Sequence, residues 1–415
     1  MTDQRLQALA QHPVARLLWQ YSLPSVVGML IWSIYNVVDR IYIGQGAGPE
    51  AISGLAITFP VMNLAAAMGV LVGVGSAART SIFLGAKQQA KAERVLGNAL
   101  VLTLIIGTIY TLCFGIWLKP ILRAFGATDV TMPYAYDFMI WMLPGLVVTN
   151  LCFSFNNIMR ASGYPMKALV TNLLGAVLNV ILDPIFIFGF DMGIKGAAIA
   201  SDISMFVAAA FVMWHFCRRS STVHFRRGIY RIDWRIVWGM VSLGAAPSVV
   251  NAASCLITMI VNTSLVHYGT DIDVGACGIF ITFTSLLTSV VVGLNMGMQP
   301  IVGYNYGAGN LHRLTGAFAL ATYWATGICT LGCVVGMLWP DVIARAFTSD
   351  PGLIRVTDNG FRHALFMFWM VGFQVISTGF FQSIGKAAQS IILGLARQVI
   401  FMYPLLKILP PPTLF

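Results

Sequence analysis

Long apolar stretches recur along the whole chain. Eleven segments of about 20 residues or more carry few charges and are separated by short stretches rich in charged residues, Gly or Pro. Unbroken apolar runs of this length predict membrane-spanning α-helices rather than a β-barrel, because lipid offers backbone groups no other partners. The predicted spans are Leu17–Tyr42, Ile52–Ala78, Val95–Trp117, Tyr134–Ile158, Met166–Phe190, Gly193–Cys217, Ile236–Val266, Val274–Ile301, Leu314–Met337, Gly360–Ile384 and Ala387–Leu409.

Composition agrees with an all-α polytopic membrane protein. Hydrophobic residues make up 58% of the 415 and charged residues 10%, against roughly 45–50% and about 25% in soluble domains. The net charge is +10, but the densest run of arginines, within residues 218–235, lies between two apolar segments. This position indicates a loop beside the lipid bilayer and argues against nucleic-acid binding. The seven cysteines are dispersed and predict neither disulfides nor a metal site.

The distribution of Lys and Arg predicts the orientation. Sixteen lie on the side of the membrane that holds the N-terminus and eight on the opposite side. Basic loops favour the cytoplasm, so we expect the N-terminus to be cytoplasmic in a multi-pass protein of the inner membrane. The first residues contain no evident cleavage site for a signal peptide, so the first helix is expected to be retained. We expect a monomer.

An internal repeat divides the chain. Pro24-Ser25-Val26-Val27 recurs as Pro247-Ser248-Val249-Val250, 223 residues later, and Gly85-Ala86 recurs as Gly307-Ala308 at an offset of 222. Six helices lie in this interval, so both copies cross the membrane in the same direction, as in transporters with parallel repeats. The sequence therefore predicts two pseudo-symmetric helical lobes, 1–217 and 236–415, joined by a basic cytoplasmic linker, 218–235. Substrate is expected to bind between them.

The chain resembles the multidrug and toxic compound extrusion (MATE) family. The resemblance covers nearly the whole chain and rests on Pro24 and Asp39 in the first helix, the two Gly-Ala pairs, the runs LNVILDPIFIFG from Leu178 and GAAIAS from Gly196, and Arg397-Gln398. It implies a secondary antiporter that exports amphipathic, often cationic compounds in exchange for protons or sodium, with no cofactor. Members have twelve helices, so this chain is expected to hold six in its first lobe and five in its second, without the twelfth.

Asp39 is a carboxylate close to the outer end of the first helix. An ionisable group at this depth is costly unless it is paired or hydrated, which makes it a candidate functional residue. Pairing with the adjacent Arg40 at the membrane surface is the alternative. The position 223 residues later is Asn262, so the two lobes differ in charge at equivalent places, as an asymmetric cation site requires.

Asn179 and Asp183 lie four residues apart and share one face of the fifth helix, with Asn172 seven residues earlier on the same stripe. Pro184 leaves open the alternative that Asp183 only ends or kinks the helix. The family resemblance implies that Asp39, Asn179, Asp183 and Ser201 line one ion-coupling pocket. Such a pocket offers oxygen ligands to sodium, or holds a proton shared between two carboxylates that resist ionising together.

Three further residues are auxiliary candidates: Asp202, Asn172 and Arg397. Asp202 follows Ser201 and is turned about 100° from it on the helix, so it points less directly into the pocket; Arg160 or Lys167 are alternative partners for it. Arg397 lies within the last apolar segment. The family resemblance implies a structural or gating role for it.

Aromatic and Met side chains suit a cavity that adapts to varied apolar cations. The candidates for the substrate cavity are Trp32, Tyr35, Phe153 and Met259, with packing against lipid or other helices as the alternative.

Motifs for hydrolytic or nucleotide chemistry are absent from the sequence. It contains no Gly-x-Ser-x-Gly, no His-Glu-x-x-His and no Gly-x-x-x-x-Gly-Lys, so no catalytic residues are assigned and an enzyme is not expected. Two alternatives to an antiporter stay open. One is a flippase for lipid-linked oligosaccharides, which should line its cavity with cations to hold phosphate. The other is a non-transporting membrane receptor or scaffold.

Overall fold

The structure is a computed structural model that describes residues 2–47, 49–268, 271–348, 350–397 and 400. Every regular element in these ranges is a helix, and nine are long and apolar enough to cross a membrane. These nine confirm the predicted all-helical membrane class and match the first nine predicted spans. They are α2 (Val14–Ala47), α3 (Pro49–Gly85), α4 (Gln89–Ala124), α5 (Met132–Ala161), α6 (Pro165–Pro184), α7 (Gly193–Cys217), α8 (Trp234–Tyr268), α9 (Asp271–Gly307) and α10 (Leu311–Leu338).

The tenth predicted span, Gly360–Ile384, is not one helix. It is replaced by α12 (Pro351–Ala364) and α13 (Trp369–Ser383), which meet at a bend of 56°. The reason is that α12 is amphipathic: Phe361 is buried, whereas Arg355 and Arg362 are exposed. An amphipathic helix of this kind is typical of a membrane surface.

Of the eleventh predicted span, Ala387–Leu409, the structure describes α14 (Ala387–Leu395), a π-helical turn at Ala396–Arg397, and residue 400. Its remainder lies outside the described residues.

Two short helices, α1 (Thr2–Gln11) and α11 (Pro340–Arg345), were not predicted from the apolar runs of the sequence. Leu9 of α1 is fully buried. The guanidinium of Arg313, at the start of α10, donates to the carbonyl oxygens of Leu9 and His12. Because these carbonyls at the end of α1 have no partner inside the helix, Arg313 fixes α1 to α10.

The internal repeat is visible in two turns. Gly163, between α5 and α6, has φ +94°, and Gly385, between α13 and α14, has φ +83°. The two positions are 222 residues apart, and both use the left-handed backbone that glycine adopts without steric cost. The same turn is thus built at the same place in each copy.

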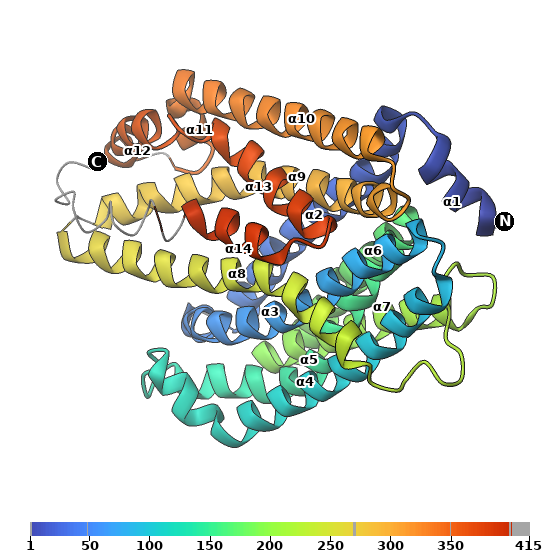
Figure 1. Ribbon diagram of the computed structural model, residues 1–415. Helices are drawn as coiled ribbons and strands as arrows, with labels where there is room; N and C mark the ends of the chain where they lie inside the picture. Colours follow the sequence, from blue (N-terminus) through green and yellow to red (C-terminus); the bar gives the residue numbers. More distant parts are fainter. Residues whose placement is uncertain (1, 48, 269–270, 349, 398–399, 401–415) are drawn as a thin grey trace.

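The helices form two groups, α2–α7 and α8–α14, which lie together toward the end that holds the N-terminus and diverge toward the other end (Figure 1). We call the end where α2 begins and α3 ends the N-terminal face. The groups meet where α2 packs on α9 and α3 packs on α8. At Gly75 of α3 an added Cβ would lie 1.9 Å from the carbonyl oxygen of Met240 in α8. At Gly293 of α9 it would lie 2.6 Å from the Cα of Val26 in α2. Glycine therefore permits backbone contact between the groups in the half of the molecule next to the N-terminal face.

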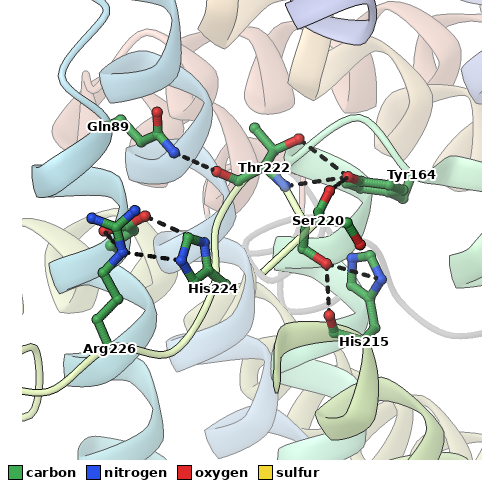
Figure 2. Close-up of polar contacts among 9 residues, drawn as sticks. Gln89, Tyr164, His215, Ser220, Thr222, His224 and Arg226 are labelled. Atoms are coloured by element: carbon green, nitrogen blue, oxygen red, sulfur yellow. Dashed lines mark hydrogen bonds and ion pairs between the residues drawn. The ribbon is translucent and has the colours of Figure 1, made fainter. Parts of the chain in front are cut away.

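The linker between the two groups packs against the first group (Figure 2). Gln89 of α4 donates to the carbonyl of Thr222 over 3.0 Å. The hydroxyl of Tyr164 accepts from the backbone nitrogen of Thr222 over 3.2 Å. His224 and Arg226 of the linker lie 3.6 and 3.4 Å from the carboxylate of Glu93, which is buried. These contacts fix the linker to α4 and to the turn after α5.

Candidate functional site

A buried polar cluster joins α2, α6 and α7 in the half of the first group away from the N-terminal face. Asn179 and Asp183 of α6 are fully buried, and Ser201 of α7 is nearly so. The amide nitrogen of Asn179 donates to Asp183 Oδ1 and to Ser201 Oγ, each over 3.1 Å. The Ser201 hydroxyl also lies 3.3 Å from the Tyr35 hydroxyl of α2. We call Tyr35, Asp39, Asn179, Asp183 and Ser201 the carboxylate cluster.

The side chains of Asp39 and Asp183 lie within hydrogen-bonding reach of each other, although they come from helices far apart in the sequence. Since a hydrogen bond between two carboxyl groups needs one proton, the pair suits a shared proton. Three oxygens are buried without a hydrogen-bond partner: Asp39 Oδ1, Asn179 Oδ1 and Asp183 Oδ2. A buried oxygen without a partner is costly, so the cluster is suited to receive a proton or a cation with oxygen ligands.

Local structure explains how Asp183 comes to face this cluster. The helix does not end at Asp183, as Pro184 allowed, but runs through Pro184 into the π-helical turn η1 (Ile185–Gly189). Proline removes one backbone hydrogen bond and favours such a local widening. Asp183 and Asn179 both lie within α6, four residues apart, and therefore share one face.

Aromatic residues lie beside the cluster. The ring of Trp32 is 5.2 Å from that of Tyr35 and 5.3 Å from that of Phe153 in α5. Trp32 and Phe153 line a cavity of about 20 Å³ between α2, α5, α6 and α7, enough for about one water molecule. The structure therefore places these three candidates inside the first group. The side chain of the fourth, Met259, lies outside the described residues.

Of the auxiliary candidates, Asp202 adjoins the carboxylate cluster and Asn172 does not. Asn172 is three turns of α6 from Asp183, about 16 Å along the helix, and its Oδ1 accepts from Asn156 Nδ2 over 3.3 Å. The carboxylate of Asp202 lies against α5, where an added Cβ on Gly145 would come 1.7 Å from its Oδ1. Arg397 is exposed in the π-helical turn after α14.

Arg160 is a buried residue that sequence reasoning assigned to a loop. Its Nη1 lies 3.3 Å from Ser25 Oγ of α2 and 3.5 Å from Met296 Sδ of α9, and its Nη2 lies 3.0 Å from Asn157 Oδ1. It is 7% exposed and forms no ion pair with any described residue, so the alternative of pairing with Asp202 is wrong. Arg160 thus joins the first group to the second near the N-terminal face.

Comparison with known proteins places this architecture among exporters. The MatE family model matches residues 24–185 and again residues 247–406. The multidrug export protein MepA of Staphylococcus aureus (strain MRSA252) is 25% identical over 403 residues, 97% of this chain and 89% of MepA. MepA of Staphylococcus haemolyticus (strain JCSC1435) is 25% identical over 413 residues, 99% of this chain and 90% of that protein.

Solved structures of MATE transporters have a similar fold. A crystal structure of MATE in complex with MaD3S has a TM-score of 0.89 at 25% identity and covers 95% of this chain and 88% of that one. An outward-facing conformation of a multidrug resistance MATE family transporter of the MOP superfamily has a TM-score of 0.90 at 24% identity, with 97% and 90% covered.

Proposed function

Because the chain belongs to the MatE family, a family of transporters rather than enzymes, we propose that it is a secondary antiporter. It exports amphipathic, often cationic compounds and takes up protons or sodium in exchange. The observation that carries the ion-coupled part is the carboxylate cluster, where two carboxyl groups from α2 and α6 meet among buried oxygens without partners. The MepA relatives are named multidrug export proteins, which supports export of more than one compound.

Transport follows from movement of the two lobes, 1–217 and 236–415, about their contact, with α1 attached to the second lobe through Arg313. The described contacts of Gly75 and Gly293 lie in the half of the molecule next to the N-terminal face, which favours a state open to the opposite side. Ion binding at the cluster joins α2 to α6 and changes which conformer is favoured. An ion and a drug that favour different conformers are exchanged rather than carried together.

Counterflow tests this function. Purified protein is placed in vesicles loaded with unlabelled ethidium, and uptake of labelled ethidium is followed without any ion gradient. A carrier exchanges the two and gives a transient overshoot of label. A receptor or scaffold gives no uptake beyond binding, and that result would contradict the proposal. Vesicles without protein serve as the inactive control.

We also propose an orientation in the membrane. We expect the exposed residue Arg219 to lie in the cytoplasm and the exposed residue Arg355 outside, because the N-terminal face carries the excess of basic residues. In a chain without native cysteines, a membrane-impermeant maleimide should label Arg355→Cys on intact cells and label Arg219→Cys only after lysis. The reverse pattern contradicts the proposed topology.

A further inference from the structure

A cleft opens at the N-terminal face where the linker meets α8. It has a volume of about 520 Å³, and the residues that line it include Arg94, Arg231, Asp233, Trp234 and Arg235. The carboxylate cluster lies near the other end of the first group, so this cleft is a separate site. Nothing in the antiport cycle uses it.

The cleft carries positive charge that is not neutralised by ion pairs with the described residues. Arg94, Arg231 and Arg235 are all exposed, and none forms an ion pair with a described residue. The one carboxylate in the lining, Asp233, accepts the backbone N–H of Arg235 over 3.0 Å at the start of α8. Three arginines in the lining of one cleft suit a phosphate, because a guanidinium group can donate two hydrogen bonds to phosphate oxygens.

Two tryptophans place the cleft at the depth of lipid headgroups. Trp234 and Trp238 are 75% and 74% exposed, and they lie four residues apart on one face of α8. The apolar span of this helix begins at Trp234. Exposed tryptophan at the end of a membrane span is typical of the interface between lipid and water.

The backbone of the cleft is held in place before any ligand arrives. Asn98 of α4 donates to the carbonyl oxygens of Ile229 and Arg231 over 3.4 and 3.2 Å, and its Oδ1 accepts from the backbone nitrogen of Asp233 over 2.9 Å. One buried side chain, Asn98, therefore fixes the backbone of the linker on both sides of Arg231. A preorganised site loses little freedom on binding.

We propose that this cleft binds the phosphate headgroup of one anionic phospholipid from the leaflet at the N-terminal face. The three arginines hold the phosphate, and the apolar surface of α8 with Trp234 and Trp238 receives the acyl chains. The tryptophans favour a lipid over a soluble phosphate, since a soluble anion has no use for apolar surface. Basic pockets beside membrane helices bind anionic headgroups in this way.

Native mass spectrometry of the full-length protein in detergent tests the proposal. The probes are phosphatidylglycerol and, for comparison, phosphatidylcholine. We expect one phosphatidylglycerol to be retained in preference to phosphatidylcholine. The triple variant R94Q/R231Q/R235Q should weaken that binding about a hundredfold, and R231Q or R235Q alone about fivefold.

The matched control is K87Q/K91Q/R219Q, which removes three exposed cations of the same face that do not line the cleft. It should retain lipid like the unaltered protein. Equal loss in both triple variants would mean nonspecific attraction and would overturn the site. Inorganic phosphate is then added at about 10 mM, enough to occupy a site of millimolar affinity. Displacement of the lipid by this phosphate would also overturn the proposal, because the occupant would then be a soluble anion.

Discussion

The Asp183→Asn variant is expected to lose ion-driven dye accumulation in inverted membrane vesicles, and Asp39→Asn is expected to do the same. Both changes keep the shape of the side chain and remove the group that takes up a proton or binds a cation at the carboxylate cluster. Exchange of one monovalent ethidium cation for one proton or sodium ion moves no net charge, so a tenfold ion gradient, worth about 1.4 kcal/mol, supports about a tenfold ethidium ratio. Accumulation should therefore fall from about tenfold to near equilibrium, while ethidium binding in detergent stays within about threefold, less than 1 kcal/mol.

Asp202→Asn is the matched control. It is a third carboxylate in the same half of the first group, but it lies against Gly145 of α5. We expect it to retain most of the accumulation. If Asp202→Asn abolished accumulation while the other two variants kept it, the coupling site would lie at α5 and α7 instead.

The Gly75→Val variant is expected to reduce turnover at least tenfold. The added Cβ would lie 1.9 Å from the carbonyl oxygen of Met240, so α3 and α8 must separate before the side chain fits. Overpacking of this kind costs about 1–3 kcal/mol, and here the cost falls on one conformer of the cycle, the one closed at the N-terminal face. Counterflow rates measure the loss, and the protein should still insert at its normal level.

Gly327→Val on α10 is the control for the second prediction, because no atom lies within 4 Å of a Cβ added there. It carries the same substitution in a membrane helix and should transport normally. If Gly75→Val retained full turnover, the contact between α3 and α8 would not be part of the transport cycle.

Much of the fold was predictable because lipid makes composition decisive. A run of 20 apolar residues has few alternatives to a helix in a membrane, so the first nine spans follow from the sequence. The bend between α12 and α13 did not follow from the sequence, since the apolar residues Leu365–Phe368 link the two helices without a break in hydropathy. The helix α1 is too polar to be predicted as a membrane-spanning segment.

The candidate site was also predictable from the sequence only in part. Asn179 and Asp183 share a face by their spacing, and the structure places both in the cluster. Tyr35, assigned to the substrate cavity, lies in the cluster, and its spacing of four residues from Asp39 on α2 is a signal that could have indicated this. Arg160 gave no such signal. It contacts Ser25 of α2 and Met296 of the other group of helices, and the local sequence pattern does not reveal contacts between distant segments.

The most direct test of ion-coupled export uses the purified protein in sealed vesicles with one imposed gradient at a time. Ethidium is supplied at equal concentration on both sides, and a proton gradient, a sodium gradient or neither is applied. The proposal predicts that one of the two gradients drives ethidium to a concentration ratio well above one, and that Asp183→Asn abolishes this effect. Equal ethidium on both sides under both gradients, from protein that still shows counterflow, would contradict ion-coupled antiport.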